Sequence, residues 1–415
     1  MVAVRFVAAV FSPLDEELGL LPGSYTPSLQ EAMTRLGAKL PYEQAREEIE
    51  RFCHTVVSEP TLRRHTTGNG QVGEAIVKVE TRQIEKGEIS SEPQPSKILI
   101  SADGAYIGLT GGEWREIKTV SIGEFETVVQ TDGTEKVETR SLSYFSRSYR
   151  AREFEYYALP ELHRRGVANA GLVVTVNDGA EWIQNFADYH CDDAVRVLDF
   201  SHAQGYLADA GKAVHGEETD TFQSWFRENS HSLKHEGPHP VLTNLKQLYQ
   251  QVDQPQDREI IEGSLTYLRK REAMLNYPHF RKQGYPIGSG CVESAHKVVV
   301  QSRMKQAGMR WAEANVDPML ALRNLICNDR WSQGWQQIVA YRHQQQLNKH
   351  RHKCHLALQS SVPTEPDKPI IPISPTLRPT KTKPDPAHPK QTHRPAANHP
   401  WRRSPIGRAR FITKS

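Results

Sequence analysis

Three acidic residues in this chain of 415 residues have the types and positions that metal-dependent chemistry requires. Asp103 follows the apolar run ILISA, Asp178 follows GLVVTVN, and a glycine comes directly after each aspartate. Glu293 lies after the loop PIGSG, where a helix is expected to begin. Taken singly, an Asp-Gly pair most often forms a turn, and a lone Glu in a first helical turn is most often solvated. The three acids therefore indicate metal-dependent chemistry only when they are considered together.

The ends of buried strands and the start of a helix can meet at one edge of a sheet, so these carboxylates are expected to converge. Three converging carboxylates repel one another unless a cation lies among them. Mg²⁺ prefers oxygen ligands, and a pair of such ions suits the cleavage or transfer of phosphodiesters. We expect two Mg²⁺ ions, which Mn²⁺ can replace, held by Asp103, Asp178 and Glu293. Asp199 also ends an apolar run, AVRVL, and is the alternative to Asp178 as the second acid.

Basic residues follow Glu293 on its helix and at the exit of that helix: Lys297, Arg303, Lys305 and Arg310. Counting by three and four from Glu293 places His296, Lys297, Val300, Gln301 and Met304 on one helical face. A basic face is usually only solvated, but beside a metal cluster it would neutralise phosphate groups. We expect Lys297, Arg303, Lys305 and Arg310 to contact DNA.

The elements that must position the acids indicate a mixed α/β fold. Residues 97–202 contain an apolar strand that ends at Asp103, two further strands on either side of the turn TDGTEK, and short buried strands before Asp178 and Asp199. Residues 203–284 show no strand signal and are expected to be an all-helical insertion. Residues 285–350, which carry Glu293, complete the core with helices. From 361 to 415 the chain has eleven Lys or Arg, three Asp or Glu and twelve prolines, which predicts a disordered basic tail.

The N-terminal residues 1–75 are expected to form a helical domain, followed by a charged linker over 76–96. Two amphipathic helices and a third helix after Ser58 have the outline of a helix-turn-helix. Its last helix would present Arg63, Arg64 and His65 to DNA, although an ordinary helical hairpin with a solvated basic end fits these residues equally well.

Composition excludes several classes of protein. No run of eighteen apolar residues is present, which argues against a membrane span. The cysteines are odd in number and contain no CxxC pair, which argues against a disulfide framework and favours the cytoplasm. These five residues are Cys53, Cys191, Cys291, Cys327 and Cys354.

The ordered series of motifs resembles a DDE-type insertion-sequence transposase of the ISKra type, which is related to ISLre-type and Mutator-like transposases. The motifs are SADGAYIG, VNDGAEWIQN, VLDFSHAQGYL, PIGSGCVES and RMKQAGMRW, and the similarity covers residues 18–335. The resemblance implies an RNase H-like core whose metal-binding triad is Asp103, Asp178 and Glu293. It also assigns Asp199 and His202 to an Asp-x-x-His signature near the active site. The family usually carries further N-terminal sequence, so the resemblance implies either that the N-terminal domain here is truncated or that the chain uses a late start codon.

This resemblance implies an enzyme that binds the terminal inverted repeats of an insertion sequence, cleaves them and joins them to target DNA. Such an enzyme acts as a homo-oligomer in a synaptic complex and is found with the bacterial nucleoid in the cytoplasm. Two alternatives stay open: a DNA-binding protein without catalysis, either inactive or domesticated, and a different RNase H-like nuclease.

Overall fold

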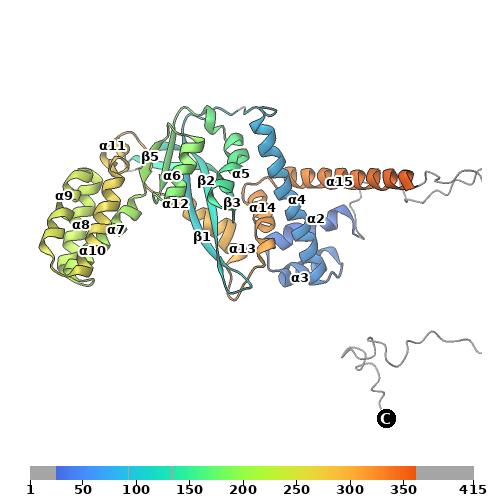
Figure 1. The fold of residues 1–415 in the computed structure, drawn as a ribbon, viewed down its shortest axis with the longest axis horizontal. Helices are drawn as coiled ribbons and strands as arrows, with labels where there is room; N and C mark the ends of the chain where they lie inside the picture. The colour runs from blue at the N-terminus through green and yellow to red at the C-terminus, as the bar shows by residue number, and fades with distance from the viewer. Residues whose placement is uncertain (1–24, 92, 132, 134, 361–415) are drawn as a thin grey trace, which may run out of the picture. The chain divides into compact units, whose positions relative to one another are not determined.

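The computed structural model describes residues 25–91, 93–131, 133 and 135–360, which form a five-stranded mixed sheet with helices on both faces (Figure 1). The strands are β1 (Ile98–Gly108), β2 (Trp114–Val129), β3 (Glu135–Arg147), β4 (Val173–Asn177) and β5 (Val195–Leu198). The helices before β5 are α2 (Pro27–Lys39), α3 (Tyr42–Cys53), α4 (Glu59–Glu85), α5 (Ala151–Arg164), η1 (Val167–Asn169) and α6 (Glu181–His190). The helices from β5 to Lys282 are α7 (Phe200–His215), α8 (Asp220–His235), α9 (Pro238–Gln251), α10 (Pro255–Lys270), η2 (Glu272–Leu275) and α11 (Tyr277–Lys282). The last helices are α12 (Gly290–Ala295), the π-helix η3 (His296–Gln301), α13 (Ser302–Met304), η4 (Glu313–Asn315), α14 (Val316–Cys327) and α15 (Trp331–Ser360).

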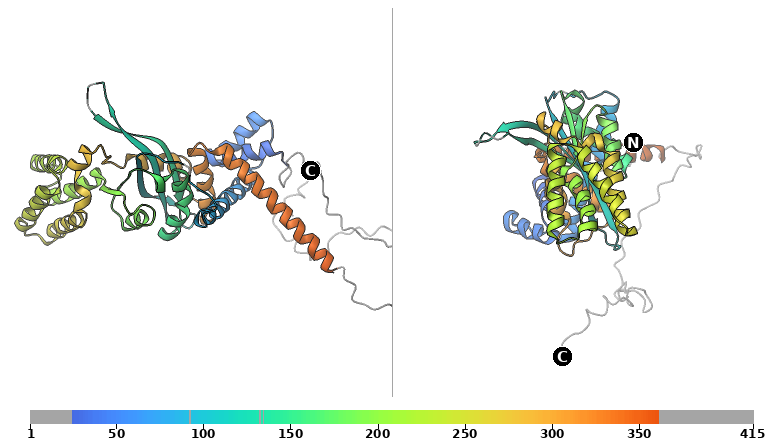
Figure 2. Two further views of the ribbon diagram at one scale, coloured as in Figure 1. Left: turned by 90° about the horizontal axis from the view of Figure 1, so that it is seen from above. Right: turned by 90° about the vertical axis from the view of Figure 1, so that its left-hand side faces the viewer.

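The strand order across the sheet is β3-β2-β1-β4-β5. β1, β2 and β3 pair antiparallel, whereas β4 pairs parallel to β1 and β5 pairs parallel to β4. The β2–β3 pairing continues beyond Ile98, the first residue of β1, to Val129 opposite Glu135, and Figure 2 shows this hairpin extending past the other strands. The expectation of a mixed α/β fold is therefore confirmed.

Alternation along the strands buries both faces of the sheet. Ile98 and Ile100 of β1 pack with Phe154 of α5 and with α6 on one face, whereas Leu99 packs with Leu207 of α7 on the other. All five residues of β4 are buried, as expected for a central parallel strand covered on both sides. The carboxyl end of β4, where Asp178 follows, is thereby held in a fixed position.

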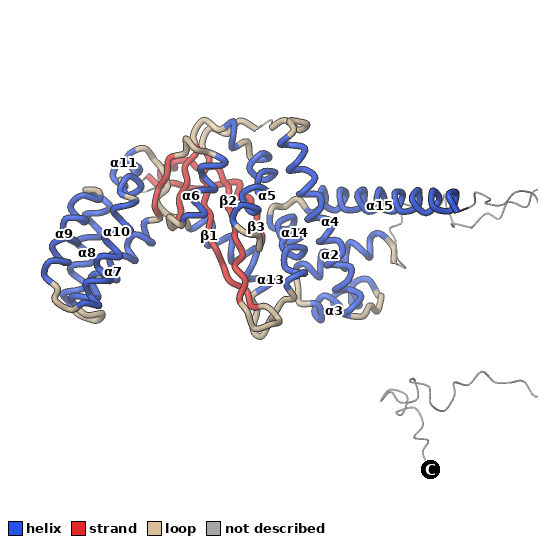
Figure 3. The backbone as a smooth tube through the Cα atoms, in the orientation of Figure 1, coloured by secondary structure: helices blue, strands red, loops and turns tan. Residues whose placement is uncertain are grey.

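Helices α7 to α11 separate β5 from the helix that bears Glu293, and between His202 and Arg281 the described chain contains no strand (Figure 3). The expected all-helical segment is therefore present. Its apolar side chains, such as Leu245 and Leu268, belong to the same hydrophobic core as β4 and β5. The helical segment is thus packed onto the sheet through a shared core.

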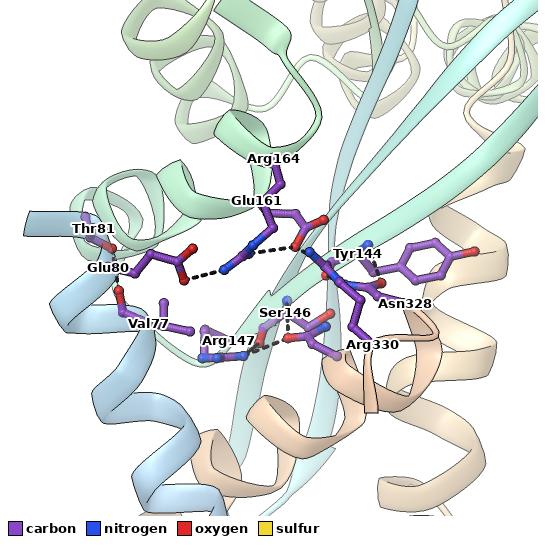
Figure 4. A network of polar contacts seen from close by, with 11 residues as sticks. Val77, Glu80, Thr81, Tyr144, Ser146, Arg147, Glu161, Arg164, Asn328 and Arg330 are labelled. Atoms are coloured by element: carbon purple, nitrogen blue, oxygen red, sulfur yellow. Dashed lines mark hydrogen bonds and ion pairs between the residues drawn. The ribbon is translucent and has the colours of Figure 1, made fainter. Parts of the chain in front are cut away.

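The linker expected over residues 76–96 is wrong in its first part, because α4 continues without a break to Glu85. This segment has contacts that a linker would lack: Thr81 is fully buried, and Glu80 pairs with Arg164 of α5 (Figure 4). Lys78 also pairs with Glu74 one helical turn earlier. The described residues up to Leu358 belong to one compact unit, so the N-terminal helices are not separated from the sheet.

Two further expectations can be placed against the described chain. The tail over 361–415, expected to be disordered and basic, lies outside the described residues. No helix within the described ranges is long and apolar enough to cross a membrane.

Candidate functional site

Asp178 lies where the sequence places it, directly after β4. Its Oδ1 atom accepts a hydrogen bond from the backbone N–H of Ala180, 2.9 Å away, at the residue before α6 begins. Gly179 between them has φ +80°, in the left-handed region that glycine adopts without strain. The Asp-Gly pair therefore forms a turn and also positions a carboxylate at the end of a strand.

Asp103 lies inside β1, opposite Thr119 of β2, and the expectation that it ends a strand is wrong. The strand continues because β2 pairs with it as far as Gly108. Gly104 fits there because the Glu116 carboxylate occupies the space that a Cβ would need. The Asp103 side chain is 39% exposed, and its Oδ1 accepts a hydrogen bond from the N–H of Gly104 at 2.7 Å.

The first two acids lie close enough to affect each other. The side chain of Asn177, which precedes Asp178, accepts a hydrogen bond from the N–H of Ala102 at 2.6 Å and so ties the two strands together beside both aspartates. Burial raises the pKa of Asp103, and the negative charges of Asp178 and Glu116 raise it further. The N–H of Gly104 and the ring of His296 act in the opposite direction. The sheet therefore brings Asp103 and Asp178 into electrostatic contact.

Glu293 is linked to Asp103 electrostatically, because both acids act on His296. Glu293 is exposed in the first turn of α12, and His296 is a buried residue at the start of η3. The Nδ1 atom of His296 lies 3.5 Å from Oδ2 of Asp103. Burial lowers the pKa of His296, whereas Asp103 and Glu293 both raise it. The charges of both acids therefore affect the protonation of His296. The sequence did not predict this role, although His296 is only three residues after Glu293.

The face that the count by three and four from Glu293 predicts is partly buried. His296, Val300 and Met304 are buried, but Lys297 and Gln301 are exposed. Residues His296–Gln301 form a π-helix, which has more residues per turn than an α-helix, so a strict α-helical count does not hold through this segment.

The donor set suits a hard divalent cation, because it consists of carboxylates. Burial is the main cause of the raised pKa of Asp103, and the negative charges of Asp178 and Glu116, which a cation would offset, add to it. Over the part of the chain that the structure describes, however, no group of three or more His, Cys, Asp or Glu side chains is arranged to hold a metal ion. The structure thus brings the acids into one region without bringing them to coordination distance.

Asp199 has a different role from the other acids. It is 4% exposed, and both carboxylate oxygens accept hydrogen bonds. Oδ1 caps α7 by accepting from the N–H of His202 at 2.8 Å, and it also accepts from the hydroxyl of Ser201. Oδ2 accepts from the N–H of Ser289 at 2.6 Å. Asp199 therefore anchors the loop from which Glu293 projects. This engagement favours Asp178 over Asp199 as the second acid.

His202 lies half-buried among aromatic rings of the helical segment. Its ring is edge-on to Tyr206 at 5.3 Å and to Tyr267 at 5.9 Å, and the two tyrosines stack 4.0 Å apart. Tyr267 in turn donates its hydroxyl hydrogen to the carbonyl of Asp178. His202 is therefore connected to the acids through Tyr267.

Helix α10 and the residue after it hold the turn that carries Asp178. Besides the bond from Tyr267, the guanidinium of Arg271 donates to the carbonyl of Gly179 from Nε at 3.1 Å and from Nη2 at 2.7 Å. The same guanidinium lies 3.6 Å from the centre of the Tyr267 ring. A Cβ on Gly179 would lie 2.5 Å from Nε of Arg271. No local pattern could have revealed these contacts, because they join residues about ninety positions apart.

The predicted basic residues divide into exposed and buried groups. Arg63, Arg64, Lys297, Lys305 and Arg310 are exposed, and His65 is half-buried.

Arg303 is 1% exposed, so the expectation that it contacts DNA is wrong. Its Nε donates to the carbonyl of Gly37 in α2 at 3.0 Å, and its guanidinium lies between the rings of Tyr42 and Trp311. Burial lowers the pKa of Arg303 to about 10. Arg303 joins the N-terminal helices to the core.

Comparison with known proteins adds no identification: no protein-family model matches the chain, and no curated protein matches it.

Proposed function

We propose that the protein is a DDE-type DNA transposase, whose sheet is an RNase H-like core and whose acids Asp103, Asp178 and Glu293 are the catalytic triad. The observation that carries the proposal is the electrostatic contact of Asp103 with Asp178 across adjacent strands, with His296 linking Asp103 to Glu293. The strand order β3-β2-β1-β4-β5, with the last two strands parallel to β1, supports an RNase H-like core. The arrival of Glu293 from beyond a helical segment supports the family resemblance.

Asp103, Asp178 and Glu293 would hold Mg²⁺, or Mn²⁺ in its place. Two such ions supply activation of the attacking oxygen and stabilisation of the leaving oxygen in phosphodiester chemistry. The protein's own contribution is positional: Asn177 fixes the spacing of the two strands, and Asp199 fixes the loop before Glu293. Tyr267 and Arg271 fix the turn that bears Asp178.

The partner is double-stranded DNA. Arg63 and Arg64 lie in the first turns of α4 and are exposed, as are Lys297, Lys305 and Arg310, which follow Glu293 in the chain. Phosphate contacts by such side chains supply affinity without sequence information, so recognition of terminal inverted repeats rests on the N-terminal helices. A reaction that joins two ends to target DNA calls for an oligomer in the synaptic complex.

The test uses duplex DNA containing the sequences that flank the gene, with Mg²⁺ or Mn²⁺. The single substitutions Asp103→Ala, Asp178→Ala and Glu293→Ala should each abolish nicking and leave DNA binding unchanged. Near wild-type cleavage by any of the three variants would refute the triad. Binding without nicking by the wild-type protein would instead favour a DNA-binding protein without catalysis. Cleavage of branched junctions in preference to these ends would favour a different RNase H-like nuclease.

A further inference from the structure

The outer end of the β1–β2 hairpin exposes two large aromatic side chains. Tyr106 of β1 is 54% exposed, and Trp114 of β2 is 59% exposed. The strand register places both on one face of the sheet, because Trp114 is opposite Gly108, two residues after Tyr106. Diagonal neighbours of this kind are about 7–8 Å apart, within reach of aromatic side chains. The two rings therefore belong to one exposed surface.

Helices cover the same face at its other end. Ile100 of β1 and Val120 of β2 pack there with α5 and α6. Past Ala102 the two strands continue beyond these helices to the end of the hairpin (Figure 1). The opposite face remains packed to that end, where Ile107 and Ile117 are fully buried. The hairpin end is therefore held in place from one face and open on the other.

Arg310 adds a third planar group to the open face. The segment that carries it runs beside the end of β1, where the N–H of Trp311 donates to the carbonyl of Gly108 and the N–H of Thr110 donates to the carbonyl of Trp311, both at 3.0 Å. The guanidinium lies over the Trp114 ring, 5.4 Å from its centre. A Cβ on Gly108 would lie 2.1 Å from Nη1 of Arg310. Gly108 thus lets the guanidinium lie against the strand, beside the exposed ring.

The remaining residues of this surface favour a nucleic acid over a protein as the partner. Four other residues of the two strand segments lie on it: Gly104, Gly108, Glu116 and Lys118. None of them is aliphatic, whereas a protein interface has an apolar core from which charged residues are depleted. Glu116 forms an ion pair with Lys118, so the exposed Arg310 gives the surface a net positive charge. That charge complements a phosphate backbone.

We propose that Tyr106, Arg310 and Trp114 form a stacking platform for the unpaired bases of single-stranded DNA. Bases of any sequence stack on aromatic rings and on guanidinium planes, and a cation beside the rings pairs with the backbone. The inference rests on the proposed function for its partner, DNA, and adds that one strand of this DNA is bound unpaired. Asp103 and Tyr106 are an odd number of residues apart along β1, so their side chains project from opposite faces. The platform can therefore be tested separately from the acids.

The first test measures the affinity of the full-length chain for a labelled oligothymidylate of about 12 nucleotides by fluorescence anisotropy, with EDTA present. Trp114→Ala and Tyr106→Ala should each weaken binding at least about fivefold, because each removes a stacking partner for a base. Trp114→Phe keeps an aromatic ring and should retain most of the affinity. Tyr189→Ala is the matched control, since Tyr189 lies on α6 and is also 54% exposed, and it should bind like the wild type.

The salt dependence separates stacking from phosphate contact. Trp114→Ala removes no charge, so the slope of log K against log salt concentration should stay at its wild-type value. Arg310→Gln removes one charge and should reduce that slope by about 0.7. A reduced slope in Trp114→Ala would overturn the stacking role.

Three other results would also overturn the proposal: no binding of the oligothymidylate by the wild-type chain, wild-type affinity in both alanine variants of the platform, or an equal loss in Tyr189→Ala. Self-association that Trp114→Ala abolishes without a change in DNA affinity would overturn it in favour of a contact between copies of the chain. Because the assay contains no free divalent metal, its result does not depend on the triad. Wild-type cleavage with no effect of Trp114→Ala on strand binding refutes the platform alone, whereas strand binding without any cleavage refutes the proposed catalysis alone.

Discussion

Replacing Asp199 by Asn separates an anchoring role from a metal-binding role at this residue. Oδ1 of Asp199 caps α7, and Oδ2 accepts a hydrogen bond from the N–H of Ser289, 2.6 Å away. Asparagine caps helices as well as aspartate does, so the capping bond should survive. Its amide nitrogen cannot accept, so the N–H of Ser289 would lose its partner.

The expected cost follows from that single bond. A hydrogen bond to a charged acceptor contributes about 1.5–3 kcal/mol, and the loss of a buried charge offsets part of it. Asp199→Asn should therefore lower the free energy of unfolding by about 2 kcal/mol. Asp199→Ala also removes the cap and should cost about 1 kcal/mol more.

Urea unfolding of the full-length chain, followed by circular dichroism, measures both values. Asp209→Asn, at an exposed position of the same helix, is the control and should unfold like the wild type. On the proposed function, Asp199→Asn should cleave DNA more slowly with an unchanged dependence on Mg²⁺ concentration. Wild-type stability together with loss of metal-dependent cleavage would refute the anchoring role and make Asp199 the second acid.

Three further predictions use the same assays. Gly179→Ala forces a left-handed backbone and a Cβ against Arg271, so unfolding should become easier by about 1–2 kcal/mol, whereas Gly263→Ala, in open space on α10, should not destabilise. Arg303→Met should lower stability and spare the salt dependence of DNA binding, whereas Lys305→Met should reduce the slope of that dependence by about one and spare stability. Because the pKa of Asp103 is raised in the folded protein, the fold binds that proton more tightly than the unfolded chain, and its contribution to stability is lost as pH rises from about 3.8 through the raised value. Asp103→Asn should remove this pH dependence; a wild-type slope in that variant would contradict the assignment.

The acids were predictable where the sequence pattern is local. The run before Asp178 is mainly apolar because β4 is buried on both faces, and the residue after such a strand falls at the edge of the sheet. Asp103 was misplaced because the Asp-Gly pair that it forms with Gly104 is typical of a turn. In the fold they pair with β2, and the Glu116 side chain fills the space beside Gly104.

Other features depend on contacts that single-sequence patterns do not contain. Arg303 is buried beside the aromatic rings of Tyr42 and Trp311, which are far apart in the sequence. Tyr267 and Arg271 donate hydrogen bonds to the turn that bears Asp178, and these contacts join segments that are distant in the sequence. The continuation of α4 was visible in part, because Glu74 and Lys78 are spaced for a helical ion pair.

The unbroken α4 also has a consequence for the DNA. Its 27 residues span about 40 Å, and near the middle the helix lies so close to α14 that a Cβ on Gly70 would overlap the carbonyl of Pro318. On the proposed function, the basic residues that meet the DNA end and the acids that cut it therefore belong to one rigid body. Inserting roughly 5 bp between the bound sequence and the cut site turns the scissile phosphate to the opposite side of the duplex, where the acids do not reach. The protein then recognises the rotational phase of its DNA ends as well as their sequence.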